Sequence, residues 1–169
     1  YIAQISNHVA TLMRVGLRDH VHCAVFRKYP KNAPKLEELA PDMPPEYRGL
    51  MPVVTEHVPG DYRLMAAHQC RYQGRRFIHL TVMNDHNLLS VVISKKQPGE
   101  SFQTENMIPA LVQSGLPFYQ GSVQRYSIAG FESRDHLIYI VSDLPKEQNI
   151  QILTAMAPGI KKELSKTEL

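Results

Sequence analysis

The sequence predicts an α+β fold: a five-stranded antiparallel meander sheet with a long N-terminal helix and a C-terminal helix packed on it. Three observations support this class. Apolar residues recur at helical spacing near the N-terminus, at every second position in the middle of the chain, and again at helical spacing near the C-terminus. Helices that flank a run of strands and cover one face of the sheet are typical of α+β proteins.

The N-terminal part is expected to be helical and is followed by a connector. In residues 1–28 the apolar side chains, from Ile2 to Val25, follow the period of an amphipathic helix, and Tyr29-Pro30 ends the pattern. Residues 30–60 are rich in proline, which indicates a connector with only short helices. We expect these at residues 34–39 and 44–57, the second interrupted at Pro52.

Residues 61–169 are expected to form the sheet and the closing helix. Alternation of apolar and polar residues predicts five strands: Tyr62–Tyr72, Arg75–Met83, Leu88–Lys95, Val123–Phe131 and His136–Ser142.

A long loop and a start signal complete this plan. Prolines across residues 97–118 predict a loop with one helical turn at 108–113. The sequence Ser142-Asp143-Leu144-Pro145 is a helix-start signal, and the closing helix is expected to run from there towards Leu164, with a break at Pro158-Gly159.

Composition limits the possible functions. The chain has 169 residues, of which 43% are hydrophobic and 21% charged, as expected for one globular domain covering residues 1–169. Its 19 Lys and Arg against 16 Asp and Glu give a net charge of +3, and the basic residues are scattered, so we expect no nucleic-acid partner. The sequence has no P-loop, dinucleotide fingerprint, nucleophile elbow or His-Glu-x-x-His motif, so we expect no enzyme activity.

Both cysteines of the chain lie close to histidines. In "DHVHCAV" His20 and His22 precede Cys23, and in "AAHQCRY" His68 precedes Cys70. On a strand, His68 and Cys70 share a face, and on a helix His20 lies beside Cys23. If the first helix packs on the first strand, the two clusters meet.

Three interpretations of these clusters stay open. The first is a metal site, in which His20 or His22, Cys23, His68 and Cys70 give two imidazoles and two thiolates, a set suited to tetrahedral zinc. The second is a Cys23–Cys70 disulfide that joins the helix to the sheet. The third is a pair of buried, reduced and inert cysteines. A redox variant of these clusters has protonated histidines lowering the pKa of one of the thiols.

Other histidines and methionines offer weaker signals. His79 is expected to be a satisfied strand histidine whose face adjoins His68. Met65, Met83 and His86 are suitable copper ligands, but dispersed methionines are more typical of gap-filling in a core.

Several phrases carry a family resemblance. "LRDHVHCAVF", "HQCRYQGRRFIHLTVM", "LLSVVI" and "IAGFESRDHLIYIVSDLPKEQNIQILTAMAPGI" resemble the extracytoplasmic part of bacterial transmembrane anti-sigma factors, over residues 17–160. The resemblance implies a non-enzymatic sensory or regulatory domain on the periplasmic face of the inner membrane. It also implies a sigma factor as partner, bound through a cytoplasmic domain, and a membrane helix upstream.

This sequence contains neither the cytoplasmic His-x-x-x-Cys-x-x-Cys motif nor the membrane helix of that family, and it begins at Tyr1 rather than at methionine. We therefore expect it to be a fragment, and sigma-factor binding is carried over to no residue here. An oxidising compartment would favour the Cys23–Cys70 disulfide, whereas a metal or redox sensor would favour an open site. The alternatives are a small metal-binding or thiol-redox protein and a module that forms homodimers through its first helix.

Overall fold

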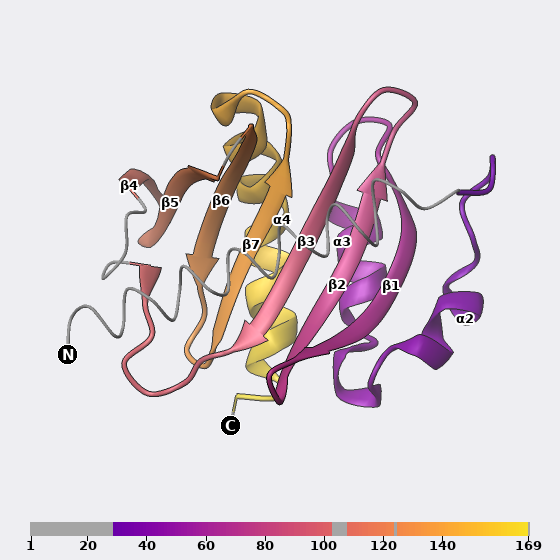
Figure 1. The fold of residues 1–169 in the computed structure, drawn as a ribbon, viewed down its shortest axis with the longest axis horizontal. Coiled ribbons are helices and arrows are strands. Elements are labelled where there is room, and N and C mark those ends of the chain that lie inside the picture. The colour runs from indigo at the N-terminus through magenta and orange to yellow at the C-terminus, as the bar shows by residue number, and fades with distance from the viewer. Residues whose placement is uncertain (1–28, 103–107, 124, 169) are drawn as a thin grey trace.

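A seven-stranded antiparallel sheet forms the centre of the protein (Figure 1). The structure, a computed structural model, describes residues 29–102, 108–123 and 125–168. The helix predicted for residues 1–28 lies outside the described residues. The strands are β1 (Arg63–Tyr72), β2 (Arg75–Met83), β3 (Leu88–Lys95), β4 (Ile108–Gln113), β5 (Leu116–Val123), β6 (Tyr126–Glu132) and β7 (His136–Ser142).

The sheet consists of two meanders joined side by side. Its strand order is β1-β2-β3-β7-β6-β5-β4, so β1–β3 form one meander, β4–β7 form the other, and β3 pairs with β7. The prediction of a single five-stranded meander is therefore wrong, although the α+β class and the antiparallel pairing are confirmed. The predicted bounds of β2, β3 and β7 agree with the structure.

The two missed strands are β4 and β5, where a loop with a helical turn was expected. Pro109 and Pro117 suggested a loop because proline cannot donate to a strand ladder. Pro109 is tolerated because β4 is an edge strand and its pairing is irregular between Pro109 and Leu111. Pro117 is tolerated because β5 pairs with β6 only from Tyr119 onward.

The helices run through the two prolines that were expected to interrupt them. Pro52 lies in the first turn of α3, where a backbone N–H has no intrahelical acceptor. Pro158 lies inside α4, and its cost is offset by the buried side chains on either side of it, including Leu153 and Ile160. The helical elements are α2 (Leu36–Leu39), two 3-10 turns (Ala40–Asp42 and Pro45–Tyr47), α3 (Leu50–His57) and α4 (Lys146–Ser165).

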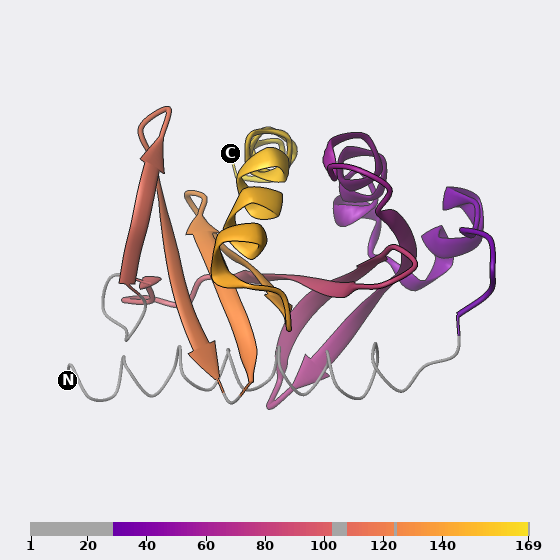
Figure 2. The same cartoon turned by 90° about the horizontal axis from the view of Figure 1, so that it is seen from above.

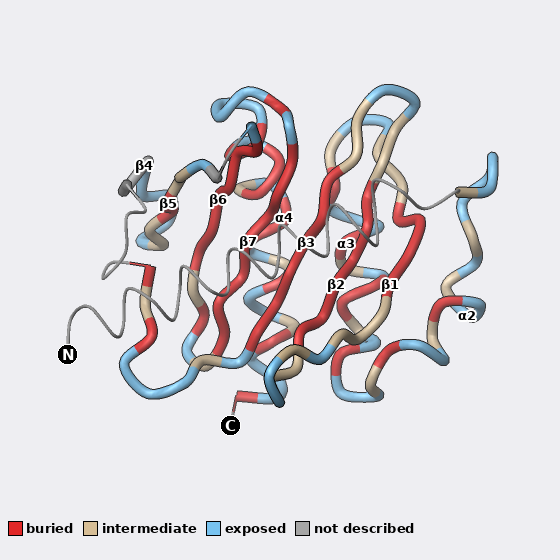
Figure 3. Tube along the Cα trace, viewed as in Figure 1, coloured by how far each residue is buried: buried red, intermediate tan, exposed pale blue. Residues whose placement is uncertain are grey.

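Helices α3 and α4 lie side by side on one face of the sheet, which we call the helix face (Figure 2). The main hydrophobic core lies between them and the strands, and Figure 3 shows the buried residues following the central strands. A Cβ atom on Gly159 of α4 would approach Val53 of α3 to 3.0 Å, so the glycine allows the two helices to pack closely. Among the described residues, no helix combines the length and the hydropathy needed to cross a bilayer.

The opposite face, which we call the second face, carries a smaller cluster of aromatic and aliphatic residues: Phe77, Val92, Phe102, Tyr119, Tyr126, Ile128, Leu137, Tyr139 and Val141. Gly130 makes room for Phe102 in this cluster. A Cβ on Gly130 would lie 2.7 Å from Cε2 of Phe102 and 3.1 Å from the carbonyl oxygen of Ile138.

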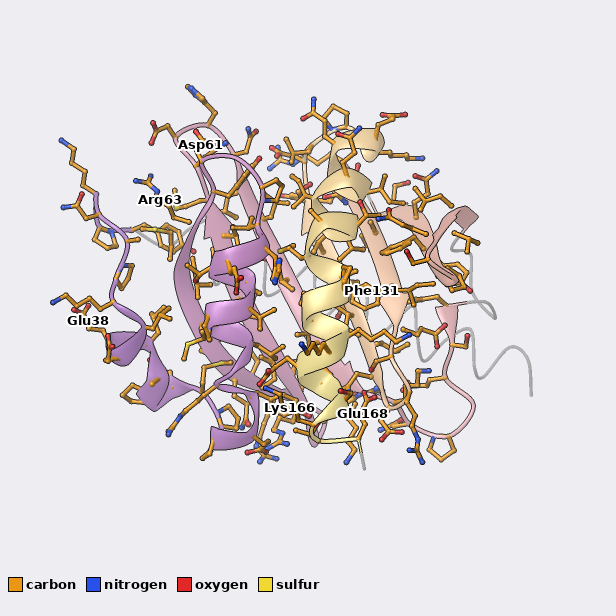
Figure 4. The ribbon with its side chains drawn as sticks, turned by 180° about the vertical axis from the view of Figure 1, so that it is seen from behind. Glu38, Asp61, Arg63, Phe131, Lys166 and Glu168 are labelled. Carbon is orange, nitrogen blue, oxygen red and sulfur yellow. The ribbon has the colours of Figure 1, made fainter. Side chains whose placement is uncertain are left out.

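A buried polar chain ties the C-terminus to the sheet and to the connector. Oε1 of Glu168 accepts hydrogen bonds from Nδ1 of His136 at 2.6 Å, from the backbone N–H of Asp135 at 3.2 Å and from the hydroxyl of Ser133. Nε2 of His136 lies 2.9 Å from the hydroxyl of Tyr47, to which it is hydrogen-bonded. Figure 4 shows Glu168 just beyond the end of α4, close to Lys166.

The hydrogen bonds that Glu168 accepts lower its pKa. Burial raises that pKa, but the hydrogen bonds from Ser133, His136 and the backbone N–H of Asp135 outweigh it, so the net pKa lies below its ordinary value. A folded-state pKa below the unfolded one means that Glu168 stabilises the fold fully above pH about 4.5, and that this contribution is lost as the pH falls through the folded-state pKa.

We predict that Gly130→Ala lowers the free energy of unfolding by about 1–3 kcal/mol, because the new methyl group overlaps Phe102. Urea denaturation measures the loss. In a Phe102→Leu background the same substitution should cost less, since leucine has no ring atoms at that point. An equal cost in both backgrounds would contradict the assignment to Phe102.

We predict that Glu168→Gln destabilises the protein by about 1–3 kcal/mol at pH 7, because it removes a buried, charge-assisted acceptor. The difference between this variant and the unaltered chain should shrink as the pH falls below about 4.5. Urea denaturation at several pH values measures both effects. Glu147→Gln, at an exposed position in the first turn of α4, is the control and should change stability little at any pH.

Candidate metal centre

The hairpin of β1 and β2 sets the position of the candidate site. A two-residue turn, Gln73-Gly74, joins the strands, and both residues have positive φ angles, 51° and 76°. Such a turn matches the twist of a hairpin and fixes its register. The register places His68 opposite His79, and Cys70 opposite Phe77, on the second face.

Three ligand-bearing side chains meet there. The imidazole rings of His68 and His79 have centroids 4.9 Å apart and are tilted by 54°. One ligand atom each from His68, Cys70 and His79 lies within 4.8 Å of the other two. His79 is fully buried, whereas His68 and Cys70 are half-buried. The group is therefore anchored in the sheet on one side and accessible on the other.

The donor set suits a borderline or soft metal ion. Two imidazole nitrogens and one thiolate are ligands of zinc and of copper, and a zinc ion with three protein ligands keeps a fourth position for another ligand. Around one tetrahedral zinc, ligand atoms are about 3.3–3.8 Å apart, given Zn–N and Zn–S bonds of about 2.0–2.3 Å. Zinc binding would thus draw the three ligand atoms, which lie within 4.8 Å of one another, together by at most about 1.5 Å.

Ser90 on β3 orients His79. Its Oγ lies 2.8 Å from Nε2 of His79, and both residues are fully buried. When Nε2–H donates to this oxygen, the lone pair is on Nδ1. Metal-binding histidines commonly donate their second N–H in this way, which fixes the tautomer and the ring orientation.

The sequence-based candidates are placed as follows. His68 and Cys70 lie side by side on one face, as predicted. His79 was expected to be a structural histidine adjoining His68; the adjacency is confirmed, and its role as a third candidate ligand was missed. The signal was present, because a two-residue turn at Gln73-Gly74 already implies the pairing of His68 with His79.

The other half of the predicted cluster, His20, His22 and Cys23, lies outside the described residues. The convergence of the two clusters and the Cys23–Cys70 disulfide therefore stay predictions.

The copper alternative gains little support. Met83 and His86 line a cleft of about 250 Å³ beside the β2–β3 turn, while Met65 is buried in β1. In the part of the chain that the structure describes, His68, Cys70 and His79 form the only group of three or more His, Cys, Asp or Glu side chains with metal-ligand spacing. The turn itself is explained by Asn84, whose Oδ1 accepts the backbone N–H groups of His86 and Asn87.

Comparison with known proteins does not assign the site. No protein-family model matches the chain, and no curated protein matches it significantly.

We predict that Ser90→Ala lowers the free energy of unfolding by about 1–2 kcal/mol, because it removes the hydroxyl bonded to a buried imidazole. Urea denaturation at neutral pH measures the change. Thr81→Val is the matched control, since Oγ1 of Thr81 is buried and has no hydrogen-bond partner within the described residues. The control should be close to neutral or stabilising. A loss in the control as large as that in Ser90→Ala would contradict the orienting role of Ser90.

Proposed function

We propose that this chain is a sensory domain that binds one transition-metal ion, with zinc the best candidate, through His68, Cys70 and His79. One observation carries the proposal: a ligand atom from each of the three side chains lies within 4.8 Å of the other two. The ligands stand on two directly paired strands, so their backbone positions are fixed before a metal arrives.

The exposure of the site and the type of its ligand atoms both support the proposal. β1 is an edge strand of the sheet, and the two half-buried ligands, His68 and Cys70, both stand on it. A metal ion can therefore reach the site without opening the core. The thiolate of Cys70 favours zinc or copper over magnesium and calcium, which prefer oxygen ligands.

We further propose that the domain is the extracytoplasmic part of a membrane-anchored anti-sigma factor, and that it controls transcription without being an enzyme. Support comes from the sequence resemblance over residues 17–160. In this proposal the sigma factor is held by a cytoplasmic domain beyond this chain. The metal site is the input, and residues 1–28, predicted to be helical, connect it to the membrane.

The fourth ligand is proposed to come from the first cluster, with Cys23 preferred to His20 or His22 because a second thiolate strengthens zinc binding. The same two cysteines form the alternative disulfide. Disulfide formation consumes the Cys70 thiolate, so the oxidised protein should lose the metal site.

We predict that the reduced protein binds one zinc ion per chain, and that Cys70→Ser and His79→Gln each weaken binding about a hundredfold or more, because each removes one of very few ligands. Competition with a chromophoric zinc chelator measures the affinity. His86→Gln is the control, because His86 is an exposed histidine outside the group, and it should bind zinc as the unaltered chain does.

Intact mass spectrometry under native and denaturing conditions, with and without reductant, separates the alternatives. Zinc retained under native conditions and lost on denaturation, with both thiols then open to alkylation, supports the proposal. A mass deficit of about two hydrogens that reductant removes, together with no zinc binding by the reduced chain, would refute it.

A further inference from the structure

A groove lies on the helix face, across the sheet from the candidate metal centre. It runs between α4 and the β4–β5 hairpin and has a volume of about 430 Å³. Figure 2 shows the hairpin standing beside α4 at one end of the sheet. The groove is lined on the hairpin side by Leu116 and Phe118, and on the α4 side by Thr154, Pro158, Lys161 and Lys162, among others.

The strand order explains why apolar side chains of the β4–β5 hairpin line the groove. α4 packs mainly on β6 and β7, so the outer strands β5 and β4 extend past its cover. The register pairs Leu111 with Phe118 and Gln113 with Leu116, which places all four side chains on the side that faces α4. Leu111 is 37% exposed and extends the apolar surface towards the sheet edge.

The α4 wall of the groove is positively charged. Thr154, Pro158, Lys161, Lys162 and Ser165 recur at helical spacing on one side of α4, and they span about 16 Å along the axis. Lys161 and Lys162 are both exposed. Of the residues that the structure describes, no Asp or Glu lines the groove.

We propose that this groove binds a single-chain amphipathic carboxylate, of the chemical class of medium-chain fatty acids. The apolar chain lies along Leu116 and Phe118, and the carboxylate lies between the ammonium groups of Lys161 and Lys162. An apolar floor with a small number of placed charges is the usual design of small-molecule sites. The volume lies near the lower end of the range of such sites, about 300–1,000 Å³, which favours a free single chain over a two-chain lipid.

Isothermal titration of the full chain with sodium decanoate, below its aggregation concentration, tests the proposal. We expect one decanoate per chain, with decyltrimethylammonium binding at least about tenfold more weakly because its charge is opposite. The double variant Lys161→Gln/Lys162→Gln should weaken decanoate binding about fivefold or more, the order expected for two partly screened ion pairs.

Two further variants test whether decanoate binds in the groove or is attracted by the overall charge of the protein. Lys35→Gln/Lys146→Gln removes the same charge at exposed positions outside the groove and should change binding less than about twofold. Thr154→Phe fills the groove from α4 and should abolish binding while circular dichroism shows an unchanged fold.

Three results would overturn the proposal. The first is the absence of saturable decanoate binding. The second is equal binding by the ammonium compound or by the double lysine variant. The third is binding to anionic phospholipid vesicles without binding to free decanoate, which would make the groove a membrane contact instead.

Discussion

The register of the β1–β2 hairpin is the constraint on which the candidate site depends. Gln73 and Gly74 both adopt positive φ angles, so the turn holds two residues and the pairing of the flanking strands follows from it. A slip of one residue would move every side chain of β1 to the other face. His68 and Cys70 would then point towards the helix-side core, and the group formed with His79 would no longer exist.

The two faces of the sheet carry different hydrophobic clusters and different candidate binding sites. The helix face holds the main core. At the outer strands β4 and β5, which α4 does not fully cover, the same face carries an apolar groove bordered by two lysines. The second face combines aromatic packing with the two neighbouring imidazoles of His68 and His79 and the thiol of Cys70 near its β1 edge. The buried hydrogen bonds from Tyr47 to His136 and from His136 to Glu168 join the connector, β7 and the residues that follow α4.

Local patterns predicted the parts of the fold that local chemistry determines. The alternation in β2, β3 and β7 gave their bounds, since these buried strands have few residues that break the pattern. β4 and β5 were missed because Pro109 and Pro117 are typical of loops. Pro109 is acceptable because β4 is an edge strand, and Pro117 because β5 pairs with β6 only from Tyr119 onward, and neither fact has a local signal in the sequence. The common face of His68 and Cys70 followed from their spacing, because residues two apart on a strand point to the same side. The position of His79 beside them depends on the register of the hairpin. The hydrogen bond between His136 and Tyr47, which are 89 residues apart, had no local signal in the sequence.

Zinc K-edge X-ray absorption of the reduced, zinc-loaded chain tests the metal proposal most directly, because it reports the atoms bound to the ion. The account predicts a sulfur shell near 2.3 Å together with imidazole nitrogens at about 2.0–2.1 Å, and loss of the Cys70 sulfur from that shell in Cys70→Ser. A shell of oxygen and nitrogen alone in the unaltered chain, with no sulfur, would contradict it.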